Sequence, residues 1–254
     1  MSEADALLQA IFDTPADDSP RLVYADWLDE HGERHHAELI RLQCEWERLS
    51  PADPRRRANW AGQNRVWRTC AEGWAWELWG LDSVDLVHFR RGFLETTLWV
   101  TLDWLVKRSA FWWPRLPVRS VCIADQEADA VELELFANSP ALDRVEELGI
   151  PWLEGDAGVV TLTGSPYLSR LRVLRLEYLE LGNRAARALA RCPRLGGLRE
   201  LYLRGSDIGD AGVEALADSP HLTSLALIDL QDNPVGRFAI NKLRAQMPRT
   251  DVIT

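Results

Sequence analysis

The stretch from Leu198 to Ser224 reads LRELYLRGSDIGDAGVEALADSPHLTS, and the residues that follow begin the same pattern again. Apolar residues alternate at its start, as Leu198-x-x-Leu201-x-Leu203, which is the period of a half-buried β-strand. A glycine-containing bend comes next, and Asp210–Ala217 then has the composition of a short helix. Strand, bend and helix together predict one supersecondary unit of 27 residues.

This unit recurs along the C-terminal half of the chain. Strand patterns that begin at Leu171 and Leu225 stand 27 residues before and after the first one, and an apolar residue followed by glycine comes after each of the three. Two earlier strand patterns begin at Val118 and Val145, and the spacings from Val118 to Leu171 are 27 and 26 residues. We therefore predict five units, which end near Pro248.

A single unit cannot bury its own apolar side, so neighbouring units must stack to close a core. The strands then form a parallel sheet on the concave face, and the helices line the convex face. The register predicts that one continuous core contains Leu174, Leu176, Leu201, Leu203, Ile228 and Leu230.

The array resembles the leucine-rich repeat family, in its longer helix-bearing type. The family pattern has Asn or Cys three residues after the last strand leucine. Asn233 fits this position, whereas Leu179 and Ser206 depart from it. The resemblance implies an α/β fold, with a right-handed leucine-rich repeat solenoid over residues 117–254.

Residues 1–50 predict an all-helical module instead. Residues 3–13 have a helical pattern, and a third helix is expected from about Glu33 to Leu49. Between them, Ser19 is expected to cap the second helix with Pro20 at its first position, and Gly32 to end it. On that helix we expect a core-facing stripe of Leu22, Ala25 and Leu28 with Val23 and Trp27 beside it.

The motif DDSPRLVYADWLDEHG in this second helix resembles the bacterial repeat-companion domain, a short module found ahead of repeat arrays. The match covers about residues 3–46. The resemblance implies no catalytic residue that could be carried over to this chain.

Residues 51–116 are predicted to form a tryptophan-rich helical connector and N-terminal cap with a first strand. Ten of the twelve tryptophans of the chain lie between residues 46 and 113. Trp60, Trp67 and Trp74 recur at i, i+7 and i+14, so on a helix they form one stripe of roughly 21 Å. We interpret this helix as a core element that caps the open end of the repeats. An exposed aromatic patch that meets a partner is the alternative.

Acidic residues and histidines gather at the end of the second helix. With Asp26 nearby, the spacing of His31 and His35 could present two imidazoles to a metal ion. Gly32 is expected to end the helix between them, which would break that geometry. The sequence contains no G-x-S-x-G, P-loop, H-E-x-x-H or dinucleotide motif. We therefore predict a protein that is not an enzyme and has no cofactor and no metal.

The net charge of −10 and the isoelectric point near 5.1 oppose binding to nucleic acid, which depends on a basic surface. No apolar run reaches the ~18 residues of a membrane span, and the acidic start lacks the basic region of a signal peptide. The four cysteines lie far apart, which predicts reduced and mostly buried thiols. We expect a cytoplasmic protein that binds neither nucleic acid nor a membrane.

Alternation along each strand decides which side chains point away from the core. One further strand is expected at Phe93–Val100, with Leu94, Thr96, Leu98 and Val100 inward and Trp99 outward. In the five repeats the outward positions are Ser120, Cys122 and Ala124; Glu147, Gly149 and Pro151; Val173, Arg175 and Glu177; Glu200, Tyr202 and Arg204; Leu227, Asp229 and Gln231.

Charged groups of both signs surround a tyrosine in the richest part of this face, at Arg175, Glu177, Tyr202, Arg204 and Asp229. This composition is typical of protein-binding surfaces. We predict a noncatalytic adaptor that binds a protein partner there and at Trp99. Three alternatives stay open: a solvated sheet face without a partner, a structural or regulatory subunit that docks through the tryptophan-rich segment, and a metal-dependent enzyme that uses Asp26, His31 and His35.

Overall fold

The computed structural model describes residues 2–78, 89–94, 98–102, 119–123, 130–151 and 155–254, and for 70–78, 89, 94 and 98–100 it describes the backbone alone. The chain divides into two compact units. The helical unit contains residues 1–96 and 110–118, and the sheet unit contains residues 97–109 and 119–254. The predicted boundary at 116/117 lies outside the described residues.

The sheet unit contains a parallel sheet of seven strands in the described residues, in the order of the sequence. Its strands are β3 (Leu98–Val100), β4 (Ser120–Ile123), β5 (Glu147–Gly149), β6 (Val173–Arg175), β7 (Glu200–Tyr202), β8 (Leu227–Asp229) and β9 (Asp251–Ile253). The register is the one that the 27-residue period predicts, because Leu174 pairs with Leu201 and Leu201 pairs with Ile228.

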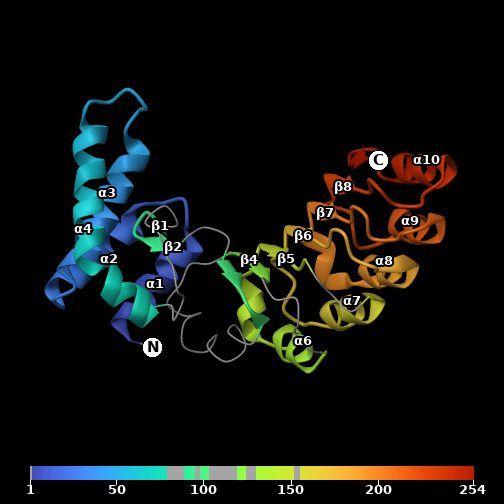
Figure 1. The fold of residues 1–254 in the computed structure, drawn as a ribbon, viewed down its shortest axis with the longest axis horizontal. Coiled ribbons are helices and arrows are strands. Elements are labelled where there is room, and N and C mark those ends of the chain that lie inside the picture. Colours follow the sequence, from blue (N-terminus) through green and yellow to red (C-terminus); the bar gives the residue numbers. More distant parts are fainter. Residues whose placement is uncertain (1, 79–88, 95–97, 103–118, 124–129, 152–154) are drawn as a thin grey trace. The chain divides into compact units, whose positions relative to one another are not determined.

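Helices return the chain between these strands and cover one face of the sheet (Figure 1). They are α6 (Ala130–Ala137), α7 (Gly155–Thr163), α8 (Gly182–Arg191), α9 (Asp210–Ala217) and α10 (Arg237–Gln246), with the 3₁₀ turns η3 (Pro140–Arg144) and η4 (Pro193–Gly197). We call the other face of the sheet the open face. The bounds of α9 are those that the sequence predicted. This arrangement is leucine-rich-repeat-like.

The core between sheet and helices is the predicted one. Leu174, Leu201 and Ile228 are fully buried, as are Leu176 and Leu203, and Leu230 is 3% exposed. The chain continues past Pro248 into β9, a strand that the predicted end of the array left out. Its Val252 pairs with Ile228 and extends the same core.

Two polar ladders join successive repeats. Side chains at the start of three helices lie 27 residues apart and bind the next helix: Asp156 Oδ1 accepts the Ala185 N–H, Asn183 Oδ1 accepts the N–H groups of Gly209 and Gly212, and Asp210 Oδ1 accepts the Gly236 N–H. Each helix therefore helps to cap its neighbour, because helix N-termini leave backbone donors without a partner in the helix.

The second ladder uses the position where the resemblance expects Asn or Cys. Asn233 donates to the carbonyl oxygens of Leu203 and Leu230 and accepts the N–H groups of Ser206 and Ile208. Ser206 is fully buried and donates to the Leu176 carbonyl at 2.7 Å. The serine therefore replaces part of what an asparagine would do, which explains how this departure from the pattern is accommodated.

The helical unit contains α1 (Glu3–Asp13), α2 (Ser19–Glu30), α3 (Arg34–Arg48) and α4 (Arg55–Leu78). The three N-terminal helices agree with the prediction to within one residue or so, and Gly32 follows the end of α2 with a φ of +90°. The N-cap prediction is off by one residue, because Asp18 occupies the cap and Ser19 is already helical. Asp17 instead accepts hydrogen bonds from the Ser19 N–H and hydroxyl.

The buried stripe of α2 differs from the predicted one. Ala25 and Leu28 are buried as expected, but Val23 is 52% exposed and the side chains of Arg21 and Tyr24 are buried instead. Arg21 lies inside because its Nη1 donates to the carbonyl oxygens of Pro15 and Asp17, in the loop before the helix. A charged residue can be buried when backbone acceptors surround its head group.

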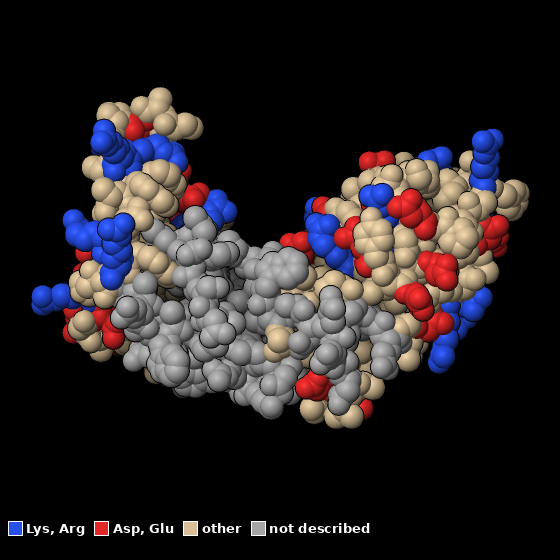
Figure 2. All heavy atoms as spheres, in the orientation of Figure 1, with Lys and Arg blue, Asp and Glu red and all other residues tan. Residues whose placement is uncertain are grey.

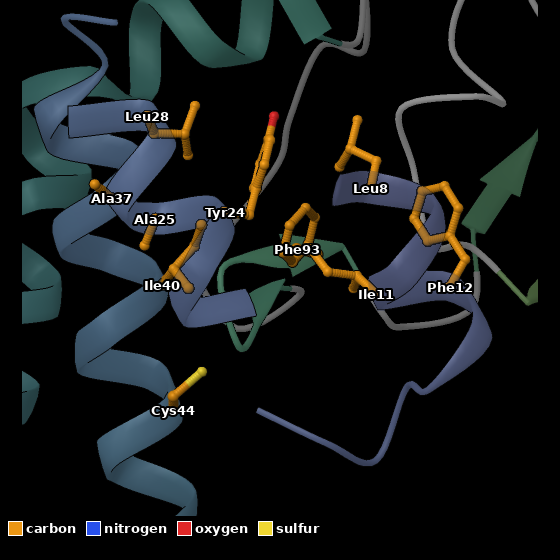
Figure 3. Packing of buried hydrophobic residues seen from close by; sticks show 10 residues of the cluster. All are labelled: Leu8, Ile11, Phe12, Tyr24, Ala25, Leu28, Ala37, Ile40, Cys44 and Phe93. Atoms are coloured by element: carbon orange, nitrogen blue, oxygen red, sulfur yellow. The ribbon is translucent and has the colours of Figure 1, made fainter. Parts of the chain in front are cut away.

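A hairpin completes this core. Strands β1 (Phe89–Arg90) and β2 (Phe93–Leu94) pair antiparallel around a two-residue turn, in which Arg91 and Gly92 have φ values of 52° and 83°. Positive φ at both positions is the rule for tight hairpin turns. The ring of Phe93 lies 5.9 Å from that of Tyr24, and Figure 3 shows it among the side chains of α1 and α2.

The strand predicted over Phe93–Val100 is described only at its two ends, which pair in different sheets, and residues 95–97 lie outside the described residues. Phe93 and Leu94 belong to the hairpin, whereas Leu98–Val100 forms β3 in the parallel sheet. A Cβ on Gly92 would lie 2.8 Å from the Ile40 Cα, so the hairpin turn is packed tightly against α3.

Helix α4 contains the three tryptophans that predicted it; the Trp74 side chain lies outside the described residues, and Trp67 is half-buried. Asn59, Gln63 and Val66 are at most 5% exposed, whereas Trp60 is 43% exposed. Amide side chains connect the unit: Asn59 and Gln63 are hydrogen bonded to each other, Gln63 to Gln43, and Gln43 accepts the Gly92 N–H at 2.7 Å. None of the described helices combines the length and the apolar composition that crossing a membrane requires.

Candidate functional site

Two columns of side chains run across the open face. The register aligns Cys122, Gly149, Arg175, Tyr202 and Asp229 in one column, with one residue from each strand from β4 to β8. Ser120, Glu147, Val173, Glu200 and Leu227 form the other. Three of the predicted outward residues, Arg175, Tyr202 and Asp229, are thus consecutive members of the first column. Basic and acidic atoms lie next to one another on the sheet unit (Figure 2).

Arg175 and Tyr202 form the centre of this face. The Arg175 guanidinium lies over the Tyr202 ring, 4.1 Å from its centroid, and its Nε donates to Glu147 Oε1 at 3.0 Å. The Tyr202 hydroxyl donates to Glu200 Oε2 at 2.8 Å. Partial burial and this carboxylate raise the pKa of Tyr202. The phenol therefore stays protonated, and both side chains are held in one geometry before any partner binds.

Arg204 and Glu177 lie at the edge of the face and are partly exposed. Arg204 donates to Asp232 Oδ2 at 2.8 Å, and its guanidinium lies 5.7 Å from the centroid of the Tyr178 ring. Glu177 forms no ion pair with any residue that the structure describes. Its carboxylate interacts electrostatically with the Arg175 guanidinium, which is paired with Glu147.

Asp229 is less accessible than the sequence suggested. It shares the column with Tyr202, but it is 7% exposed, and its Oδ1 accepts the Gln231 N–H at 2.9 Å. The unpredicted strand β9 pairs beside it and places Ile253 next in the column. The backbone of Trp99 aligns with Cys122 as expected, and its side chain lies outside the described residues.

A pocket of about 320 Å³ opens on this face at strands β4 to β6. Its lining contains Val121, Cys122, Glu147, Gly149, Ile150, Pro151, Arg175, Glu177 and Tyr178. Six of these residues were among the outward positions predicted from the sequence, but only the structure shows that they surround a pocket. Tyr178 was not among the predicted site residues, because it follows the strand rather than alternating along it.

Comparisons with known proteins add little to this geometry. No protein-family model matches the sequence, nor does any curated protein. A crystal structure of an internalin from Listeria monocytogenes is similar over 56% of this chain and 42% of its own, with 16% identity and a TM-score of 0.34. This chain thus spans less than half the length of that internalin. We base the leucine-rich-repeat-like assignment on the registered repeats of the chain itself.

Of the residues considered for a metal site, His35 is exposed, and His31 and Asp26 are engaged in other contacts. The His31 ring stacks on Trp27 at 3.9 Å, and its Nδ1 lies 2.7 Å from the Trp27 carbonyl oxygen. Asp26 forms an ion pair with Arg41. Within the described residues, no group of three or more His, Cys, Asp or Glu side chains is placed to hold a metal ion.

His36 and three of the cysteines are packed within the protein. His36 lies 2.9 Å from the Gly92 carbonyl oxygen, and packing around the ring lowers its pKa. Cys44, Cys122 and Cys192 are buried and free, and burial raises the pKa of Cys44 to about 12. Thiols with a raised pKa are poor nucleophiles, because the thiolate is the reactive form.

Proposed function

We propose that this protein is a noncatalytic interaction module that binds a protein partner through the open face of its leucine-rich-repeat-like sheet. The observation that carries the proposal is the pair Arg175 and Tyr202. Both side chains point away from the core, both are held by neighbouring carboxylates, and both belong to residue types that dominate binding energy in interfaces. Side chains ordered beforehand lose little freedom on binding.

The finer assignments belong to the same proposal. We infer a right-handed solenoid whose open face is concave, preceded by a helical module of the repeat-companion type. The negative net charge favours a protein partner over nucleic acid. The residues proposed to contact the partner are Arg175, Glu177, Tyr202, Arg204 and Trp99, with Asp229 as a support beneath the surface.

Capture of the native partner by variants of the full chain tests the proposal. Arg175→Ala and Tyr202→Ala should each weaken binding by ~1 kcal/mol or more, about fivefold in the dissociation constant. Arg187→Ala is the matched control, because Arg187 is exposed on α8, on the opposite side of the sheet. Equal capture by the double variant Arg175→Ala, Tyr202→Ala and weak capture by Arg187→Ala would move the binding site to the helical face.

A second candidate function is a structural or regulatory subunit that docks through the tryptophan-rich segment. The exposure of Trp60 at 43% favours it, because a large aromatic side chain at a surface is a common anchor. However, Trp60 also packs on Trp46 at 5.7 Å, and Trp67 is half-buried. Trp60→Ala should reduce partner capture under this candidate and leave it unchanged if the open face binds.

A further inference from the structure

The pocket lies at Gly149 because the first column of the open face changes there from small side chains to large ones. Gly149 stands between Cys122 and Arg175, and the Arg175 side chain leans over Tyr202 on its other side. A Cβ on Gly149 would lie 3.3 Å from Cys122 Sγ, which is closer than ordinary van der Waals contact, so a side chain at this position would crowd the cysteine. Cys122 and Pro151 contribute apolar surface to the pocket, and the buried residues Val121 and Ile150, at most 1% exposed, lie directly behind it.

Tyr178 forms one wall of the pocket at a conformational cost. Positions 178, 205 and 232 are equivalent in the 27-residue repeat, and all three have φ between 56° and 59°. The other two repeats use Gly205 and Asp232, which adopt this left-handed conformation more readily than a bulky residue does. The Tyr178 ring is 66% exposed, so burial of the ring offsets little of this strain. Strained residues of this kind gather at functional sites.

The next repeat is adapted to this tyrosine. A Cβ on Gly205 would lie 2.8 Å from Tyr178 Cδ1, so a larger residue there would displace the ring. The Tyr178 N–H also donates to the Arg204 carbonyl at 2.6 Å, which fixes the backbone that carries the ring. Two successive repeats thus hold an exposed aromatic ring at the mouth of an apolar pocket.

The pocket lining is negative, and the Arg204 guanidinium lies outside that lining, 5.7 Å from the centroid of the Tyr178 ring. Glu147 is already paired with Arg175 and accepts a hydrogen bond from the Ser120 hydroxyl, whereas Glu177 has no ion-pair partner among the described residues. The lining therefore carries two carboxylates and one guanidinium. An aromatic ring and an unpaired carboxylate above an apolar floor suit a cation on a hydrocarbon stem.

We propose that the Gly149 pocket binds an arginine or lysine side chain from a basic segment of the protein partner. The methylene groups of that side chain pack on Cys122 and Pro151, and its charged end lies between the Tyr178 ring and the Glu177 carboxylate. This proposal rests on the proposed function, since it names the anchor that a partner inserts into the open face. It also assigns Tyr178 a binding role, and this role would account for its strained and exposed position.

Selection of random displayed peptides on the full chain tests this occupant directly. Enriched peptides should contain a shared arginine or lysine, and replacing that residue by leucine in a synthetic peptide should weaken binding roughly tenfold in titration calorimetry. Enriched peptides that share an apolar or acidic residue instead, or the absence of any enriched peptide, would overturn the proposal.

Variants of the chain locate the site. Gly149→Val should fill the pocket, and Glu177→Gln should remove its unpaired charge; each should weaken binding of the same synthetic peptide roughly tenfold. Glu134→Gln on α6 is the matched control for the lost carboxylate, because Glu134 is exposed on the helical side. Melting temperatures check the fold, and Gly149→Ala provides a milder change if the valine variant is unstable.

The outcomes separate the two proposals. If Gly149→Val and Glu177→Gln bind the peptide as the unchanged chain does, while Arg175→Ala and Tyr202→Ala bind the native partner weakly, the pocket proposal fails and the proposed function stands. If the Arg175 and Tyr202 variants also bind the partner normally, the open face is not the binding surface and both fail.

Discussion

The two units of this protein build their cores in opposite ways. In the sheet unit, equivalent residues such as Leu174, Leu201 and Ile228 stack on one another across adjacent strands. In the helical unit, Phe93 of the hairpin packs on Tyr24 of α2, and Gly92 of the same turn is bonded to Gln43 of α3. One core repeats a local rule, whereas the other depends on contacts between residues far apart in the chain.

The two units also differ in how their polar side chains find hydrogen-bond partners. Polar groups in the sheet unit recur with the repeat, as Asp156, Asn183 and Asp210 do at the starts of helices. The helical unit instead buries single groups, above all Arg21, which is fully enclosed. A repeated interaction adds stability in increments that neighbours share. A unique buried group makes a whole core depend on one residue.

The largest expected effect follows from Arg21. Arg21→Ala removes two hydrogen bonds to the loop before α2 and leaves a cavity, so it should lower the free energy of unfolding of the helical unit by about 3 to 5 kcal/mol. Urea unfolding measures the loss, and hydrogen exchange with mass spectrometry should find it spread over α1 to α3.

Arg21→Met is the control, since methionine keeps most of the side-chain volume and donates no hydrogen bond. It should recover part of the loss. If Arg21→Met and the unchanged chain unfold at the same urea concentration, the hydrogen bonds of Arg21 make no net contribution to the free energy of unfolding. The two units would then differ only in how their apolar side chains pack.

Leu201→Ala should have the next largest effect, about 2 to 5 kcal/mol, because it opens a cavity in the continuous core of the sheet unit. Hydrogen exchange should increase most in β6, β7 and β8 and fade toward the ends of the sheet. Leu227→Ala, at a half-buried position of the open face, should cost less. A change below ~1 kcal/mol for Leu201→Ala would place this leucine outside the core.

The smallest expected effect concerns the ladder between helices. Asn183→Ala removes the acceptor for Gly209 and Gly212 at the start of α9 and should cost about 1 kcal/mol. Asn183→Asp should restore stability, because aspartate occupies the equivalent positions 156 and 210. Thermal melts compare the three proteins, and equal melting temperatures for alanine and asparagine would show that these caps do not connect the repeats.

The period of the sequence predicted most of the sheet unit because each strand and helix is repeated with the same spacing. The limits of α9 and the pairing of Leu201 follow from it directly. Strand β9 was missed because Asp251–Ile253 is a short run with no helix after it. That omission also explains why Asp229 seemed open, since the residues of β9 pair beside it.

For the helical unit, the sequence predicted where the helices lie but not which of their side chains form the core. Apolar spacing located α1 to α3, but it assigned Val23 to the core and left Arg21 out, because spacing says nothing about carbonyl groups in a loop. Tryptophan spacing located α4, but it did not indicate that Asn59 and Gln63 are buried while Trp60 is 43% exposed. Asn59 and Gln63 lie inside because their amides find one another and Gln43, which no periodicity reveals.

By itself, the sequence determined the repeat, the parallel register and the column that contains Arg175 and Tyr202, because these depend on spacing along one chain. The tertiary structure alone decided that Gly149 lies under a pocket, that Tyr178 stands at its mouth in a left-handed conformation, and that Glu177 has no ion-pair partner in the described residues. Each of these depends on how side chains from three strands lean toward or away from one another. Such packing is fixed by volume and charge in three dimensions, which spacing does not encode.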